Sequence, residues 1–172
     1  MPDKETKQEV KQIQNSGLDD KIEPQVDIEK MIRNHVWGSM GLGLVPIPWI
    51  DFLGLTGIQL NLVRKISKTY DIPFSQDKVK NTIYSLVGGV LPISLGTPLI
   101  SLVKTVPIVG QTFGAVTMPI LAGASTYAIG KVFYRHFAAG GTFLTLDPEK
   151  VKEYYAEMFQ EGKLVAGNLK NN

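Results

Sequence analysis

The stretch that decides the fold is "NTIYSLVGGVLPISLGTPLISLVKTVPIVGQTFGAVTMPILAGASTYAIG", residues 81–130. Its one charged residue, Lys104, separates two uncharged runs. Each run is longer than the roughly 20 residues that cross a bilayer as an α-helix. Both contain glycines and prolines, which are costly in water-soluble helices but better tolerated where membrane helices pack together. The stretch predicts a paired helical insert with Lys104 near its tip.

Prolines mark a second corner in "GLVPIPWIDF", residues 43–52, and its Val-Pro-Ile returns within "TVPIVGQTFG", residues 105–114. A proline cannot donate a backbone hydrogen bond and restricts the residue before it to extended conformations. Pro46, Pro48 and Pro107 therefore predict the tips of two helical hairpins with a shared plan. In the second tip, the Gly-x-x-x-Gly spacing of "GQTFG" lets two helix backbones approach closely.

Ordinary start signals bound the helices of these hairpins. Apolar residues at helical spacing predict a first helix over residues 27–44. Pro48 can serve as the first residue of a second helix over residues 49–70. Ser75 or Asp77 can cap the third helix, which enters the uncharged stretch.

Composition divides the chain into three parts, and the predicted fold class is all-α. Residues 1–24 are charged and poor in large apolar groups, which predicts a disordered tail. Residues 25–145 form the double helical hairpin, a Gly/Pro-rich membrane-associated domain. Residues 146–172 contain a C-terminal amphipathic helix, with Asp147 as its cap and an apolar stripe that begins at Val151, followed by a short tail.

Basic residues predict an orientation. They gather at the open ends of the hairpins, whereas the tips carry only Lys104. The positive-inside rule then places both termini on the cytoplasmic side. The candidate lipid-contacting bases, whose partners would be anionic headgroups, are Arg64, Lys65, Lys68, Lys131 and Arg135. The alternative is that these bases are the solvated ends of a soluble helical bundle, since bases also suit helix C-termini.

Two segments carry a family resemblance. "VPIPWIDFLGLTGIQLNLVRKISKTYDI", residues 45–72, has a Pro-x-Pro corner, then Asp51, then Gln59 in the following helix, and ends on Tyr70. "TYAIGKVFYRHFAAGG", residues 126–141, has a Tyr-x-Ile-Gly motif followed by a phenylalanine and a glycine. Together they resemble the bacterial family named Domain of Unknown Function 697.

The resemblance covers residues 28–145 and implies a membrane-associated helical protein of the bacterial inner membrane, with no agreed biochemical activity. Some family members are fused to small GTPase domains or neighbour them, so a GTPase is the partner that the resemblance implies. This sequence has Tyr70-Asp71 where the family usually has Tyr-Gly, and no GTPase domain occurs within it.

No pattern typical of an enzyme, cofactor or metal site survives inspection. The absence of cysteine excludes thiolate chemistry and cysteine metal sites. "STYAIGKV", residues 125–132, has the Gly-Lys of a phosphate-binding loop but lacks its first glycine and its final Ser/Thr. His35 and His136 are too few for a His-rich metal site, and no basic stripe with interleaved aromatics indicates nucleic acid. We expect no catalytic, cofactor-binding or metal-binding residue.

The candidate residues are therefore structural or interaction residues. They are Pro46, Pro48, Asp51, Gln59, Pro107, Gly110, Gly114 and Gly130. Asp51 lies in the first turn of the second helix, where a carboxylate accepts hydrogen bonds from free amides and meets the positive end of the helix dipole. A buried polar contact, or an ion or proton site within a membrane, stays open for it.

Three hypotheses of function follow. The first is a non-enzymatic membrane anchor or interaction module, whose charged tail and C-terminal helix remain available for a partner such as a GTPase. The second is a soluble helical bundle that oligomerises or regulates a GTPase. The third is a pore or transport element with glycine-lined helices.

Overall fold

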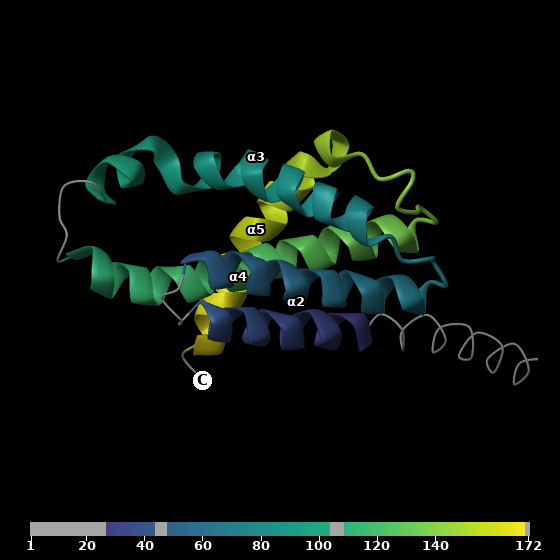
Figure 1. The fold of residues 1–172 in the computed structure, drawn as a ribbon, viewed down its shortest axis with the longest axis horizontal. Coiled ribbons are helices and arrows are strands. Elements are labelled where there is room, and N and C mark those ends of the chain that lie inside the picture. Colours follow the sequence, from purple (N-terminus) through teal and green to yellow (C-terminus); the bar gives the residue numbers. More distant parts are fainter. Residues whose placement is uncertain (1–26, 44–47, 104–108, 171–172) are drawn as a thin grey trace, which may run out of the picture.

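The computed structural model describes residues 27–43, 48–103 and 109–170 (Figure 1). Within these ranges the chain forms five helices and no strand, so the predicted all-α class is confirmed. The predicted tail, and Pro46, Lys104 and Pro107 at the predicted tips, lie outside the described residues. The side chains at positions 48–52, 90–103, 109–117 and 170 are also outside the description.

Helices α2, α3 and α5 begin close to where the sequence predicts. The described part of the first helix covers residues 27–42. It is followed by α2 (Pro48–Thr69), α3 (Gln76–Val103), α4 (Val109–Ala138) and α5 (Pro148–Lys170). Pro48 is the first residue of α2, as predicted. The carbonyl oxygen of Ser75 accepts from the backbone N of Val79 at 3.1 Å, so Ser75 is the residue that precedes α3 at its cap.

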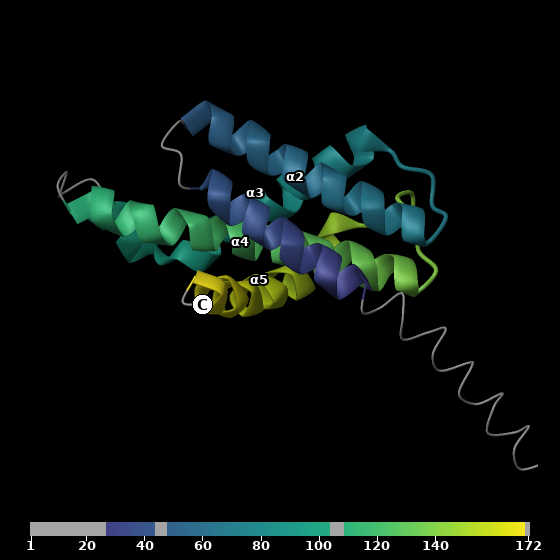
Figure 2. The same ribbon diagram turned by 90° about the horizontal axis from the view of Figure 1, so that it is seen from below.

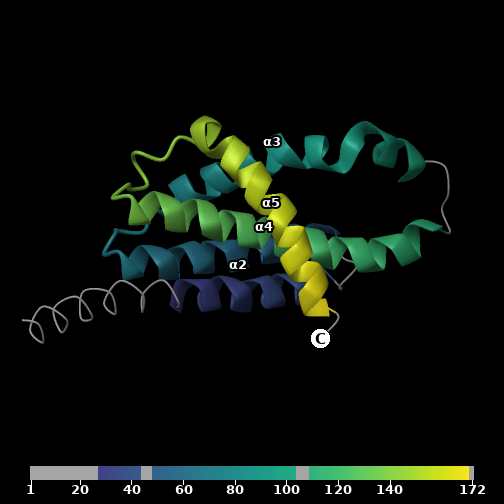
Figure 3. The ribbon, with the colours of Figure 1, turned by 180° about the vertical axis from the view of Figure 1, so that it is seen from behind.

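The five helices form two antiparallel pairs with a fifth helix across them. Figure 1 shows the first helix beside α2, and α3 opposite α4, with the two helices of each pair running in opposite directions. Helix α5 crosses α4 obliquely, as Figure 3 shows from behind. Its packing on α4 is the most extensive between any two labelled helices, and α4 also packs on α2. Helix α4 is therefore the central element of the bundle.

Part of the second pair extends beyond this bundle. Figures 1 and 2 show the C-terminal part of α3 and the N-terminal part of α4 extending past the ends of the first helix and α2. We call residues 90–103 and 109–117, which include this extension, the arm. The arm contains no charged residue. Among the described residues, no helix is both long enough and apolar enough to cross a bilayer.

At the other end, two helices finish in the same type of turn. After α2, the backbone N of Asp71 donates to the carbonyl of Lys68 (3.2 Å), and that of Ile72 donates to the carbonyl of Ser67 (2.9 Å). After α4, Gly140 and Gly141 make the equivalent bonds. This pattern places one residue in the left-handed region, with φ of +80° at Gly140 and +53° at Asp71. The usual family glycine at position 71 thus corresponds to a left-handed backbone position.

Apolar stripes from all five helices meet in one core. Ile28, Ile32 and Val36 of the first helix are fully buried, at the spacing the sequence predicts. Near the open end, the rings of Phe133, Phe137, Phe143 and Phe74 pack with centroids 5.0–6.0 Å apart. This arrangement buries large apolar areas, which supply the main favourable term in folding.

The predicted apolar stripe of α5 is present, and it is buried in the core, so this face of the helix is not available to a partner. Tyr155 and Phe159 are fully buried, and Ala166 packs in the same core. An amphipathic helix gains stability by covering its apolar face. In this protein α4 and α3 cover that face, so α5 is a core helix.

Candidate functional site

A buried polar cluster lies where α2, α4, α5 and the first helix meet. Gln59 of α2 is only 1% exposed and donates through Nε2 to the hydroxyl oxygens of Ser125 (3.1 Å) and Thr126 (3.4 Å) on α4. The Thr126 hydroxyl also lies 2.7 Å from the hydroxyl of Ser39 on the first helix. The Ser125 hydroxyl lies 3.2 Å from the phenol of Tyr155 on α5. One network therefore links four helices.

The hydrogen bonds of this network determine whether its buried polar groups lower or raise the stability of the fold. A buried amide or hydroxyl without a partner costs about 1–3 kcal/mol, whereas a hydrogen-bonded one contributes modestly to stability. Because Gln59 can reach Ser125 and Thr126 only in one alignment of α2 on α4, the network favours that alignment over shifted ones. Polar groups in an apolar core can set the register of helices in this way.

The network holds one titratable group. Burial raises the pKa of the Tyr155 phenol to about 12, and its hydrogen bond with Ser125 opposes this shift. The phenol is therefore neutral at physiological pH, so it takes part in hydrogen bonds and carries no charge. The arrangement fits a structural role and offers no group with a pKa suited to acid or base catalysis near pH 7.

Small residues let the helices around this network approach closely. A Cβ atom on Gly130 would lie 2.8 Å from a side-chain carbon of Ile32 and 3.1 Å from one of Leu62. A Cβ atom on Gly162 of α5 would lie 2.9 Å from the Cα and the carbonyl oxygen of Ala124. Real Cβ atoms do not make contacts this short, so the helix crossings depend on these glycines.

Three of the five candidate lipid-contacting bases are engaged within the protein. Lys131 forms an ion pair with Glu29 of the first helix, and its Nζ lies 5.3 Å from the centre of the Tyr127 ring. Arg135 stacks over Tyr154 at 4.4 Å. The guanidinium of Arg64 lies 4.7 Å from the ring centre of Phe74 at the open end. These contacts hold the aliphatic parts of the three side chains along the protein surface.

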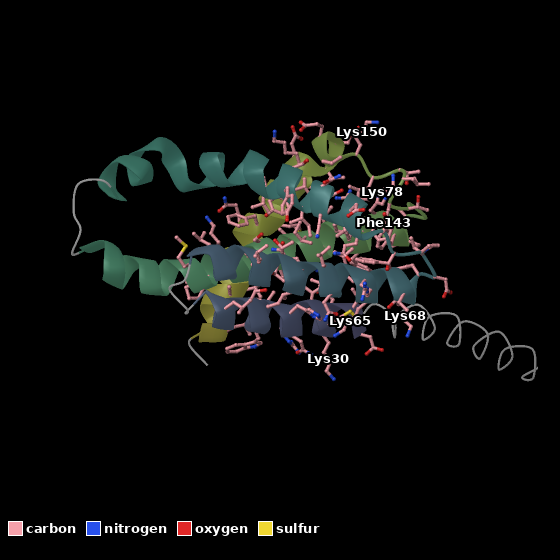
Figure 4. All side chains as sticks on the ribbon, viewed as in Figure 1. Lys30, Lys65, Lys68, Lys78, Phe143 and Lys150 are labelled. Carbon is pink, nitrogen blue, oxygen red and sulfur yellow. The ribbon has the colours of Figure 1, made fainter. Side chains whose placement is uncertain are left out.

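The other two candidate bases are exposed. Lys65 and Lys68 lie on α2 at the open end, where Figure 4 labels them with Lys30 of the first helix. Neither lysine forms an ion pair with another described residue. They are the members of the predicted set that remain fully free to meet an anionic surface.

The two histidines lie apart and have different surroundings. His35 donates from Nδ1 to the carbonyl oxygen of Met31 at 2.7 Å, which requires a proton on Nδ1. Burial lowers the pKa of His35 and the nearby Lys65 charge adds to this, while the Met31 hydrogen bond opposes it. His136 lies with Nε2 2.9 Å from the carbonyl of Thr142 in the loop after α4. Among the described residues, no three His, Asp or Glu side chains gather as metal ligands would.

Comparisons with known proteins agree with the two sequence segments. The family described as "Domain of unknown function (DUF697)" matches residues 3–163. The chain belongs to this family. It is also 37% identical over 143 residues to Magnetosome membrane protein 22 of Magnetospirillum gryphiswaldense, and the matched region covers 83% of this chain and 73% of that protein. No solved structure is significantly similar to it.

The candidate structural and interaction residues have different places in the fold. Gln59 and Gly130 lie at the helix crossings described above, and Pro48 begins α2. Asp51 falls in the first turn of α2, and Gly110 and Gly114 fall in the first turns of α4. The side chain of Asp51 and the surroundings of both glycines are outside the described residues, so their roles stay predictions.

Sequence reasoning missed the partners of Gln59 and the crossing of α4 and α5. Ser125 and Thr126 adjoin the Tyr-x-Ile-Gly motif of the DUF697 family, so their position offered one signal. A second signal was the spacing Gly162-x-x-x-Ala166 in α5, which has the same small-residue pattern as the glycine pair singled out in α4. Neither signal identifies the helix that packs against these residues.

Proposed function

We propose that this protein is a non-enzymatic, membrane-associated helical protein and that the arm is the part that enters the bilayer. The observation that carries the proposal is that residues 90–103 and 109–117 are uncharged and include the ends of α3 and α4 that project from the bundle. An apolar hairpin that leaves the core gains nothing from the core, whereas transfer into an apolar layer is favourable by roughly 25 cal/mol per Å² of apolar surface. The printed name of the relative, a magnetosome membrane protein, supports the same conclusion.

The length of the arm favours partial entry from one side. A helix rises about 1.5 Å per residue, so residues 90–103 extend roughly 21 Å, against about 30 Å for the hydrocarbon core. The arm would therefore enter as a hairpin and return to the side from which it came. The bundle and both of its termini then lie on one side, which we propose is the cytoplasmic side of the bacterial inner membrane. A GTPase partner stays a prediction from the family resemblance.

Flotation with liposomes of phosphatidylcholine alone tests this proposal with two matched double variants, because neutral lipid offers no anionic partner to the exposed bases of the bundle. Leu95→Asp/Leu99→Asp places two carboxylates in the arm. Leu53→Asp/Leu164→Asp makes the same change at leucines of the bundle that are 69% and 70% exposed. A charge near the bilayer centre costs about 2.5–3.5 kcal/mol, so we expect the arm variant to stay at the bottom of the gradient while the wild type and the bundle variant float.

Circular dichroism of each variant separates loss of binding from loss of folding. The proposal fails if the wild type does not float, or if the folded arm variant floats as well as the bundle variant. Membrane binding through another surface would give the second of these results.

A further inference from the structure

The loop that joins α4 to α5 is held in one conformation by a dense set of hydrogen bonds. His136 donates from Nε2 to the carbonyl of Thr142 at 2.9 Å. The backbone N of Thr142 donates to the Thr145 hydroxyl at 2.9 Å, and that of Leu144 donates to the Thr142 hydroxyl at 3.2 Å. Phe143 is buried, and its ring lies 5.0 Å from that of Phe137. The loop is thus fixed to the bundle on both sides of its tip.

This fixed loop holds one large apolar side chain out in solvent. Leu144 is 78% exposed, the highest value among the exposed large apolar residues of the described chain. The neighbouring Phe143 points into the core, so Leu144 cannot fold inward without displacing it. Single exposed leucines are common on protein surfaces, so Leu144 gains meaning only from the charges that lie around it.

Bases surround this loop at the open end of the bundle, where Figure 4 labels Lys68, Lys78, Lys150 and Phe143. The guanidinium of Arg64 belongs to the same end, because it stacks on Phe74, whose ring lies 5.9 Å from that of Phe143. The exposed bases of this end include Arg64, Lys65, Lys68, Lys78 and Lys150, and its exposed carboxylates include Asp71, Asp77, Asp147 and Glu149. Asp147 lies 3.7 Å from Lys150 and Glu149 lies 3.7 Å from Lys152, so Arg64, Lys65, Lys68 and Lys78 outnumber the remaining Asp71 and Asp77.

The loop and the arm lie at opposite ends of the same helix. Helix α4 begins in the arm and ends at Ala138, just before the loop, and its 30 residues rise roughly 45 Å at about 1.5 Å per residue. Figures 1 and 4 show the arm at one end of the molecule and the loop at the other. A bilayer that receives the arm lengthwise is therefore out of reach of Leu144 and the bases around it.

We propose that the loop end, formed by Leu144 with Arg64, Lys65, Lys68 and Lys78, docks on a second, anionic bilayer. The inference rests on the proposed membrane entry of the arm, and it makes the protein a bridge between two lipid surfaces. An apolar side chain among exposed bases fits a headgroup layer, in which the leucine enters the interface and the bases approach lipid phosphates. Lys131 is not part of this surface, because Glu29 already neutralises it.

A capture experiment with two kinds of vesicle tests the proposal. Immobilised vesicles of phosphatidylcholine alone are loaded with the full protein and washed. Fluorescent, protein-free vesicles that contain phosphatidylserine are then added, and their capture is measured. We expect the loaded vesicles to capture the added phosphatidylserine vesicles, and this capture to fall as the salt concentration rises. Added fluorescent vesicles of phosphatidylcholine alone should not be captured.

Matched variants locate the surface that captures. A base near an anionic membrane contributes about 1 kcal/mol, so Lys68→Glu and Lys78→Glu should each reduce capture at least about fivefold. Lys163→Glu, on α5 and away from the loop, should leave it unchanged. Leu144→Asp should reduce capture, whereas Leu164→Asp, at a leucine of similar exposure, should not.

The outcomes separate this inference from the proposed function. Failure of the protein to load the first vesicles would contradict membrane entry of the arm. Loading without capture would overturn the bridging inference alone. The partner of the loop end would then be an acidic protein surface and not a bilayer. Capture of neutral vesicles, or capture that none of the three loop-end variants reduces, would also overturn it.

Discussion

Gly162 is a position at which even a single methyl group should be poorly tolerated. A Cβ atom there would lie 2.9 Å from the Cα and the carbonyl oxygen of Ala124, and 3.0 Å from the Cβ of Tyr127. The first two are backbone atoms of α4, which cannot rotate aside as a long side chain could. Gly162→Ala must therefore push α5 away from α4 along the most extensive helix contact of the bundle.

Two terms of opposite sign set the expected magnitude. Replacing a helical glycine with alanine gains about 1 kcal/mol of helix preference. Overpacking a close contact costs about 1–3 kcal/mol, and more where only backbone can yield. Displacement of α5 also loosens the contact between Tyr155 and Ser125. We expect Gly162→Ala to lower the free energy of unfolding by about 1–2 kcal/mol.

Gly167, on the same helix, provides the control. A Cβ atom there would meet nothing within 4 Å, so Gly167→Ala should gain the helix preference without the overlap and stabilise by about 0.5–1 kcal/mol. Thermal unfolding followed by circular dichroism measures both, since 1 kcal/mol corresponds to about 2–4 °C in a chain of this size. Finding Gly162→Ala as stable as Gly167→Ala would refute the reasoning about this crossing.

Three further predictions concern stability and can be measured by urea denaturation. Asp71→Gly should stabilise by about 1 kcal/mol, because position 71 has φ of +53°, whereas Asp71→Val should destabilise. Gln59→Leu should cost about 1–3 kcal/mol, because it removes the donor to Ser125 and Thr126, while Asn61→Leu at an exposed site of α2 should change stability by less than about 0.5 kcal/mol. For His35, the pKa is lowered in the folded state, so the unfolded chain takes up the proton first as pH falls below the ordinary 6.5. Stability should therefore decline from pH 6.5 down to the lowered folded pKa, and a decline of equal size in His35→Gln would exclude His35 as its source.

Local features of the sequence were sufficient to predict the helices and their starts. Pro48 fixes the start of α2, and the amide of Glu149 donates to Asp147 Oδ1 at 3.1 Å at the start of α5, as the cap prediction required. These signals act within one turn of backbone, so they hold whatever the rest of the chain does. The DUF697 motif likewise drew attention to Gln59 and Gly130 before their surroundings were known.

Contacts across long sequence separations could not be predicted in the same way. The ion pair of Lys131 with Glu29 joins residues 102 positions apart, and it removes a base that the charge pattern had assigned to lipid. Gln59 and Ser125 are 66 positions apart. A hydrophobic or charged stripe indicates that its side chains need a partner, but it does not identify which helix of the chain supplies that partner.

The sequence by itself determined an all-helical chain, the residues at which its helices begin, and an uncharged segment unlike the rest, because periodicity, prolines and charge are properties of neighbouring residues. Only the tertiary structure decided that α5 belongs to the core, that a polar network aligns four helices, and that the uncharged arm and the basic loop end face opposite directions. These depend on which surfaces fit at a distance of a few ångströms, and small residues such as Gly162 and Gly130 make that fit where no local pattern could specify it.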